Sequence, residues 1–254
     1  MKKKKSTFAR IAIPGAIAAA AAANAVRAAR FVPEKKDYGT LSPENVDAER
    51  AQRNLSKAIS IPTISYPEKE KVDFTQFDKF HEFLDEAYPL IHKTLTKEVI
   101  CEASLMYCWK GTRSDLDPIA LLAHQDVVPI SEGTEGDWEH PPFEGYNDGE
   151  FIWGRGALDM KNHLIGVMEA VETLLEEGFT PERDVYLLFG QDEEVVASGD
   201  SGARHMMETL KERGIHLDCI IDEGGAILPV NIKGILENKD LVGVGIAEKG
   251  LHRP

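Results

Sequence analysis

A regular alternation of short apolar runs with segments of helical period constrains the fold more than any other feature of this chain. Apolar runs bounded by turn residues are typical of strands, and apolar residues three or four positions apart are typical of helices that cover a sheet. The runs predicted to be strands are Lys97–Ala103, Leu105–Trp109, Pro118–Ala123, Asp184–Gly190 and Leu217–Ile221. The segments predicted to be helices are Val46–Ile59, Phe74–Tyr88, Met160–Glu177 and Gly202–Arg213. The alternation predicts an α/β fold with a mostly parallel sheet flanked by helices.

Polar residues follow three of the predicted strands directly. His124 and Asp126 come after the first of them, the residues 192–194 after the second, and Asp222 and Glu223 after the third. Ligands of open α/β sheets gather at the carboxyl ends of the strands. We therefore expect these acids and the histidine to lie at one edge of the sheet.

The combination of a histidine with several acids indicates a metal site. A lone histidine is most often an ordinary surface or core residue, but His124 is accompanied by acids that would repel one another without a cation. Asp159, also just after an apolar segment, adds to the set. Histidine mixed with carboxylates suits zinc, or cobalt or manganese, better than magnesium or calcium.

Charge and cysteine content exclude other classes of protein. The first 30 residues hold seven Lys or Arg and no acid, which leaves 22 basic and 43 acidic residues in the remainder. Such an acidic remainder argues against nucleic acid as a partner. The three cysteines form an odd set without C-x-x-C spacing, so neither a disulfide framework nor a thiolate zinc site is indicated, and burial is the expectation for each.

The N-terminus has the pattern of an export signal. Lys2–Lys5 and Arg10 precede an alanine-rich apolar run from Ile11 to Val26. We expect residues 1–30 to be a signal peptide or membrane anchor, the only part to meet a membrane, and the remainder to be extracytoplasmic. Residues 31–45 lack periodicity and are predicted to be a linker.

Several motifs occur in an order that resembles a known enzyme family. The motifs are LLAHQDVVP at 121–129, WEHPPF at 138–143, GRGALDMK at 154–161, QDEE at 191–194 and DEGG at 222–225. Together they resemble the co-catalytic zinc peptidase family of aminoacylase, succinyl-diaminopimelate desuccinylase and bacterial glutamate carboxypeptidase. The details are most similar to the vacuolar Gly-X carboxypeptidase and to secreted hydrolases of N-acyl amino acids.

The resemblance implies a role for each polar residue. His124 would bind one of two zinc ions, Asp159 would bridge both, and Glu194 would bind the second. Asp126 would orient His124, and Glu193 would be the general base that takes a proton from the water between the metals. The last ligand in this stretch would be Asp222, which we favour, or alternatively Glu223.

The implied function is zinc-dependent hydrolysis of peptide or amide bonds. A carboxypeptidase acting on small peptides is the first hypothesis, and an N-acyl amino acid amidohydrolase is the alternative. Residues 46–250 would form the first part of the catalytic domain, and residues 251–254 would begin the next segment. In the family, a dimerisation domain and a final histidine ligand lie beyond the equivalent of Pro254. The chain alone is therefore expected to be inactive, and an inactive interaction module is a further hypothesis.

Overall fold

The computed structural model describes residues 20–27, 30, 46–198, 201–224, 227–232 and 236–242. The chain divides into two units, 1–45 and 46–254. In the first unit, residues 20–27 are helical, whereas the predicted linker at 31–45 and most of the predicted leader lie outside the described residues. Among the helices that are described, none has the length and apolar character needed to cross a membrane.

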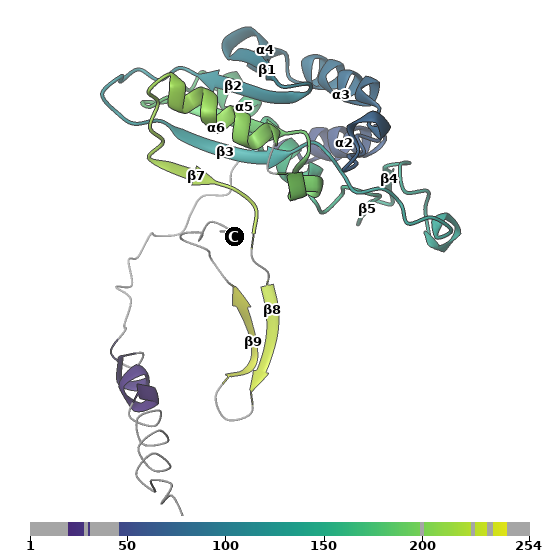
Figure 1. Ribbon diagram of the computed structural model, residues 1–254, viewed down its shortest axis with the longest axis vertical. Helices are drawn as coiled ribbons and strands as arrows, with labels where there is room; N and C mark the ends of the chain where they lie inside the picture. The colour runs from purple at the N-terminus through teal and green to yellow at the C-terminus, as the bar shows by residue number, and fades with distance from the viewer. Residues whose placement is uncertain are drawn as a thin grey trace, which may run out of the picture. The chain divides into compact units, whose positions relative to one another are not determined.

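A mixed five-stranded sheet forms the centre of the fold, with the order β1-β2-β6-β3-β7 (Figure 1). Its strands are β1 (Thr96–Ile100), β2 (Ser104–Trp109), β3 (Ile119–His124), β6 (Val185–Gly190) and β7 (Cys219–Ile221). The prediction of a helix-flanked α/β sheet is confirmed, but "mostly parallel" was too strong. Strand β3 runs parallel to β6 and β7, whereas β1 and β2 form a tight hairpin that adds two antiparallel pairings. A hairpin between neighbouring strands needs no crossover helix, and for that reason these two strands are antiparallel.

Helices cover both faces of this sheet. One face packs against α2 (Ala48–Ile59), α3 (Phe74–Ala87), α4 (Pro89–Thr94) and α5 (Lys161–Glu176). The other face packs against α6 (Gly202–Glu212), which crosses the sheet in Figure 1. Strand β2 shows the division: Leu105 and Tyr107 face the larger cluster, while Met106 and Cys108 face α6. Alternate residues of a strand point to opposite faces, so a strand buried on both sides is apolar throughout.

Local signals in the sequence explain where the helices begin and end. The side chain of Asp47 accepts the backbone N–H of Arg50 at the start of α2, and Ser201 accepts that of Arg204 at the start of α6. Side-chain acceptors at these positions satisfy donors that have no partner within the helix. Gly178 follows the end of α5 with φ of +75°, the left-handed conformation that glycine adopts without strain.

A buried polar network ties α2 to α5. The Arg50 guanidinium donates to Glu169 at 2.7 Å, and the Asn54 amide and the Tyr88 hydroxyl also donate to this carboxylate, at 2.6 and 2.9 Å. Glu169 is 4% exposed. Burying a carboxylate costs free energy unless partners such as these surround it. The network therefore fixes how α2 packs on α5.

Five elements were not predicted from the sequence. They are the helix α4, the two-residue strands β4 (Tyr146–Asn147) and β5 (Ile152–Trp153), and a separate hairpin of β8 (Ile227–Ile232) and β9 (Leu236–Val242). Three 3-10 turns complete the described elements: η1 (Lys69–Lys71), η2 (Glu135–Asp137) and η3 (Glu193–Ser198). Only η3 takes part in the candidate site.

Candidate metal centre

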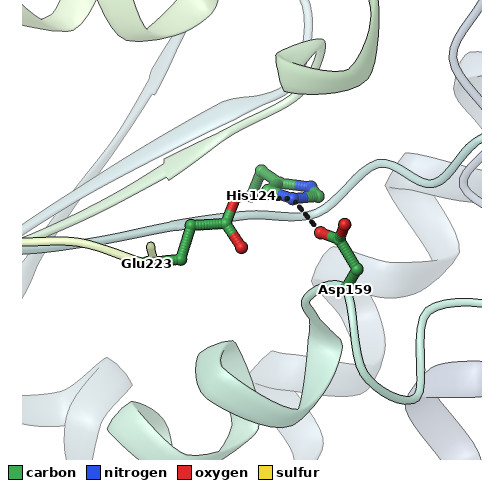
Figure 2. A group of neighbouring side chains, drawn as sticks. All are labelled: His124, Asp159 and Glu223. Carbon is green, nitrogen blue, oxygen red and sulfur yellow. Dashed lines mark hydrogen bonds and ion pairs between the residues drawn. The ribbon is translucent and has the colours of Figure 1, made fainter. Parts of the chain in front are cut away.

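Three parallel strands end at the same edge of the sheet and bring polar side chains together there. His124 is the last residue of β3, Glu193 begins η3 just after β6, and Glu223 follows β7. Asp159 comes from the loop before α5 and completes the group (Figure 2). The Nε2 atom of His124 lies 3.0 Å from Asp159 Oδ1, 3.5 Å from Glu223 Oε1 and 3.8 Å from Glu193 Oε2.

The same residues form two groups of possible metal ligands that share His124. One group is His124, Asp159 and Glu223, and the other is His124, Glu193 and Glu194. Within each group, one ligand atom from every residue lies within 4.8 Å of the others. Asp222 and Glu223 were the two candidates for the last ligand, and only Glu223 belongs to a group with His124. The Asp222 carboxylate instead accepts the backbone N–H of Glu223 at 2.8 Å.

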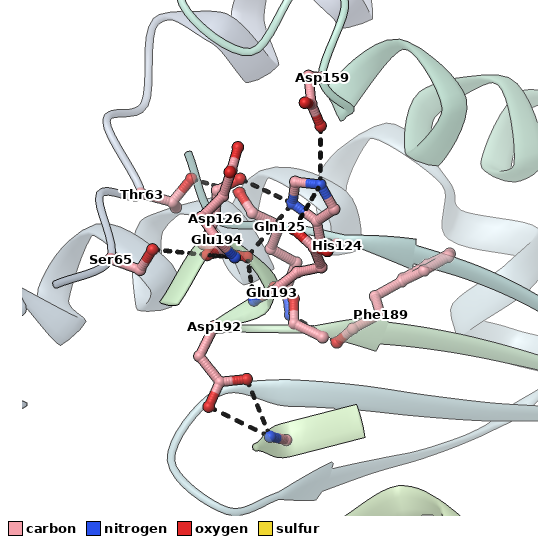
Figure 3. Close-up of polar contacts among 12 residues, drawn as sticks. Thr63, Ser65, His124, Gln125, Asp126, Asp159, Phe189, Asp192, Glu193 and Glu194 are labelled. Carbon is pink, nitrogen blue, oxygen red and sulfur yellow. Dashed lines mark hydrogen bonds and ion pairs between the residues drawn. The ribbon is translucent and has the colours of Figure 1, made fainter. Parts of the chain in front are cut away.

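Asp126 lies behind this cluster and is completely buried. Its two carboxylate oxygens accept three hydrogen bonds and lie close to the ring of His124 (Figure 3). Ser65 Oγ donates at 2.6 Å, the backbone N–H groups of Glu193 and Glu194 donate at 3.1 and 3.2 Å, and His124 Nδ1 lies 3.3 Å away. Hydrogen bonds to an ionised carboxylate are stronger than neutral ones. Asp126 therefore holds the histidine and the paired glutamates in a fixed relation to one another.

The imidazole of His124 is oriented by its inner nitrogen. Nδ1 donates to the backbone carbonyl of Asp126 at 2.9 Å, which leaves Nε2 directed at the acids. Burial would lower the pKa of His124, but the hydrogen bond and charge of Asp126, together with Asp159, raise it to about 9. Without a cation, the ring itself is therefore the positive charge among these carboxylates.

The carboxylates are crowded together, and their pKa values are raised. Burial raises the pKa of Glu193, Glu194 and Glu223 above the usual value, and the negative charge of Asp159 raises all three further. His124 opposes these effects in each case. Acids held together against their mutual repulsion gain most from a bound dication.

This donor set fits a divalent cation of the zinc type. One imidazole nitrogen with several carboxylate oxygens matches the ligand preference of zinc and its transition-metal neighbours. His124 has the second hydrogen bond that metal-binding histidines have, from the opposite ring nitrogen to a backbone carbonyl. The family implied by the motifs is metal-dependent, and the chemistry of this cluster agrees with it.

A short extended segment, Ile61–Ser65, lies against the end of β3 and was not predicted from the sequence. The Thr63 hydroxyl donates to the Gln125 carbonyl at 2.6 Å, Val127 N–H donates to Thr63 O at 3.0 Å, and Ser65 N–H donates to Val127 O at 3.2 Å. Ile64 and Val127 pair as a parallel bridge. The alternation of apolar and hydroxyl residues in IPTIS was a signal for such a strand-like segment.

A second missed residue, Gln125, fixes the chain between His124 and Asp126 from the other side. Its buried side-chain amide donates to Ala103 O at 2.8 Å and to Phe189 O at 2.9 Å, and its oxygen accepts from His81 Nε2 at 2.8 Å. These bonds join the end of β3 to the β1–β2 turn and to β6. Its place between two predicted site residues was the only signal in the sequence.

Two glycines give the chain a tight path before Asp159. Gly154 and Gly156 have φ of +145° and +84°, which glycine adopts without strain. His140 stacks on Tyr146 with ring centres 4.0 Å apart and belongs to neither ligand group.

The prediction that each cysteine is buried holds for Cys108 only. Cys101 and Cys219 are exposed, because they lie in the β1–β2 turn and on the short edge strand β7.

Comparisons with known proteins agree with this picture. The model of the Peptidase family M20/M25/M40 matches residues 120–235. A probable carboxypeptidase S-like 2 from Dictyostelium discoideum is 40% identical over 232 residues, which cover 87% of this chain and 43% of the relative. The N-fatty-acyl-amino acid synthase/hydrolase PM20D1.1 from Danio rerio is 37% identical over 215 residues, which cover 84% of this chain and 40% of the relative.

A solved structure shares the fold. The M20 family metallo-carboxypeptidase Sso-CP2 from Sulfolobus solfataricus superimposes with a TM-score of 0.55 at 19% identity, over 70% of this chain and 38% of that one. The chain thus spans about two fifths of the length of the proteins that it matches. Residues 120–235 thus match the Peptidase family M20/M25/M40, and the two relatives are similar to the chain over 87% and 84% of its length.

Proposed function

We propose that this chain supplies the first part of a metal-dependent hydrolase of peptide or related amide bonds. The observation that carries the proposal is the sharing of His124 between two groups of possible ligands, one with Asp159 and Glu223 and one with Glu193 and Glu194. Because only Nε2 of His124 faces the acids, the histidine would be a ligand of one ion, and the carboxylates of the two groups would hold that ion and a second one beside it. Zinc suits this donor set, with cobalt or manganese as substitutes.

Each side chain has a task that follows from its position. His124, Asp159 and Glu194 would be ligands, and we now favour Glu223 over Asp222 as the last ligand of this stretch, because only Glu223 approaches His124 Nε2. Asp126 would orient the imidazole and raise its basicity, since it is buried and faces Nδ1.

Glu193 is the best placed residue for proton transfer. Its side chain is 51% exposed, so solvent and substrate can reach the carboxylate, while its backbone is fixed by Asp126. Bound divalent cations would lower the pKa of a water molecule and polarise the amide carbonyl. Glu193 would accept the proton of the attacking water and return it to the leaving amine.

The preferred substrate class is a small peptide with a free carboxylate. The Dictyostelium relative, named as a probable carboxypeptidase, favours this class at 40% identity. The zebrafish relative, named as a synthase/hydrolase of N-fatty-acyl-amino acids, favours the alternative at 37% identity. Both substrates present an amide bond beside a carboxylate, so the same metal cluster would serve either reaction.

The organisation proposed for the chain follows the sequence alone. Residues 1–30 would be an export signal or anchor, 31–45 a linker, 46–250 the first part of the catalytic domain and 251–254 the start of a further segment. An extracytoplasmic location, with the membrane touched only by the N-terminal segment, would follow from the positive leader.

Two measurements test the proposal. The metal content of the purified chain is measured by mass spectrometry after dialysis against zinc, and Glu223→Gln and Asp222→Asn are measured beside it. We expect up to two zinc ions per chain and a larger loss with Glu223→Gln. A chain with no bound metal would refute the metal centre. A protein extended to the full length of the relatives is then assayed with dipeptides and with N-fatty-acyl amino acids. If it hydrolyses neither substrate, the proposed activity is refuted.

A further inference from the structure

Lys161 is a completely buried lysine close to the candidate metal centre, and none of the proposed catalytic steps uses it. It begins α5, two residues after Asp159. Its Nζ atom donates to two backbone carbonyls, Ala58 O at 2.9 Å and Ile61 O at 2.6 Å. The same atom lies 5.0 Å from the centre of the Phe80 ring. A group with these partners is not placed to touch a substrate.

The Ala58 carbonyl lies in the last turn of α2, and Ile61 lies just beyond the helix. A continuing helix would bring the N–H of residue 62 to Ala58 O, but Pro62 has no N–H. Ile61 N–H donates to Ala58 O at 3.3 Å, and Lys161 Nζ adds a shorter bond at 2.9 Å. Because Lys161 has no exposed surface, water cannot take its place. The end of α2 is thus held by the first residue of α5, which follows the loop that carries Asp159.

The segment that Lys161 holds continues directly to Asp126. After Ile61, the chain forms the strand-like segment that pairs with Val127, and at its far end Ser65 Oγ donates to Asp126 Oδ2 at 2.6 Å. Asp126 in turn faces His124 Nδ1. The polar members of this path are buried: Thr63, Ser65, Gln125, Asp126 and Lys161 are at most 2% exposed.

Space beside the lysine is also restricted. A Cβ atom added to Gly156 would lie 2.7 Å from Val127 Cγ1 and 3.4 Å from Lys161 Cδ. The backbone of Gly156 therefore lies between Val127 and the stem of the lysine, and Lys161 N–H donates to Gly156 O at 3.0 Å. The Asp159 loop and the end of β3 meet at this point, with little room for either to shift.

We propose that Lys161 is a positioning residue of the metal centre, which fixes the Asp159 loop relative to His124 by holding the segment Ile61–Ser65. This inference rests on the proposed function, because it assumes that a metal binds to His124 and Asp159. Lys161 acts only through backbone carbonyls and sets the distance between two ligands that come from separate loops. Outer partners of metal ligands change metal affinity by about 10- to 100-fold when they are removed.

The test uses the full chain and Co²⁺ as the probe, because Co²⁺ reports both affinity and coordination geometry through its visible absorption. Lys161→Met keeps an unbranched stem and removes the donor. Glu172→Gln is the matched control, since Glu172 is buried on the same helix and caps α4 through Leu90 N–H and Ile91 N–H. We expect both variants to lower the melting temperature. Only Lys161→Met is expected to weaken Co²⁺ binding, by on the order of tenfold or more, and to alter the Co²⁺ spectrum.

A double variant separates positioning from general destabilisation. If Lys161 acts through the segment that ends at Ser65, adding Ser65→Ala to Lys161→Met should weaken Co²⁺ binding less than the sum of the two separate losses. Fully additive losses would overturn the proposal. So would Co²⁺ affinity and spectrum that Lys161→Met leaves unchanged. A wild-type chain that does not bind Co²⁺ would instead refute the proposed metal centre.

A measurement on the wild-type chain covers the case in which Lys161→Met does not fold. Saturation with Co²⁺ should slow hydrogen exchange at the amides of Ser65 and Val127, since these lie on the path from Lys161 to His124. The amide of Gly111, which is bound by Asp184 at the opposite end of the sheet, should exchange at an unchanged rate. Equal rates with and without Co²⁺ at Ser65 and Val127 would overturn the positioning role.

Discussion

Replacing Asp126 with asparagine should return the pKa of His124 to its ordinary range in the metal-free protein. The substitution keeps the size of the side chain and removes the charge that faces Nδ1 at 3.3 Å. Asp126 raises the His124 pKa from 6.5 to about 9, with help from Asp159 and against the effect of burial. At about 1.4 kcal/mol per pKa unit, the loss of this rise corresponds to about 3 kcal/mol.

The sign of the effect on stability follows from the direction of the shift. A histidine whose pKa is higher in the folded state stabilises the fold fully below pH 6.5, and this stabilisation is lost as the pH rises through 9. Lys161 acts in the opposite direction over part of this range, because burial lowers its pKa to about 7. The His124 pKa itself is therefore the decisive quantity, rather than the melting temperature.

The assay is an NMR titration of the His124 ring protons with a chelator present. We expect a midpoint near pH 9 in the wild-type chain and at or below 6.5 in Asp126→Asn. Asp115→Asn is the control, since Asp115 pairs with Arg113 and does not contribute to the His124 shift. A midpoint that stays near 9 in Asp126→Asn would show that Asp126 is not the source of the basicity.

Three further predictions concern catalysis, metal binding and stability. Glu193→Gln should lower the turnover of a full-length version by on the order of 100- to 10,000-fold with unchanged zinc content, and near-normal turnover would contradict its role as the base. Zinc at 100 times its dissociation constant should raise the free energy of unfolding by about 2.7 kcal/mol, and thermal denaturation with and without chelator measures this difference. Arg50→Met should lower the free energy of unfolding by about 3–5 kcal/mol, because it leaves Glu169 buried without its cation. In contrast, Arg53→Met, which breaks the exposed pair with Glu49, should cost about 1 kcal/mol or less, and equal costs would refute the importance of burial.

The sequence predicted the strands that carry the site because their signals are local. An apolar run such as Ile119–Ala123 can be recognised without knowing its neighbours, and the polar residues after it then fall at the carboxyl end of a strand. The helices α2, α3, α5 and α6 were predicted to within two residues at each end for the same reason, with caps such as Asp47 and Gly178 marking their ends. The very short strands β4 and β5 have too few residues to show any periodicity.

The supporting residues could not be predicted because their partners are distant in the sequence. Lys161 meets the end of α2 across about one hundred residues, and nothing around position 161 indicates that its side chain is buried. The choice between Asp222 and Glu223 depends on the turn after β7, in which one residue of difference reverses the direction of a side chain. Local pattern therefore identified the ligand candidates, while the packing that orients them required the three-dimensional structure.

The two bonds from the backbone of Glu193 and Glu194 to Asp126 limit what the chain can tolerate after β6. Side chains at these positions could be exchanged without breaking either bond, because both donors are peptide groups. Inserting or deleting one residue between Gly190 and Glu193 would instead bring different amides to the carboxylate and move both glutamates from their places. Selection for folding alone should therefore accept substitutions in this turn more readily than a change of its length.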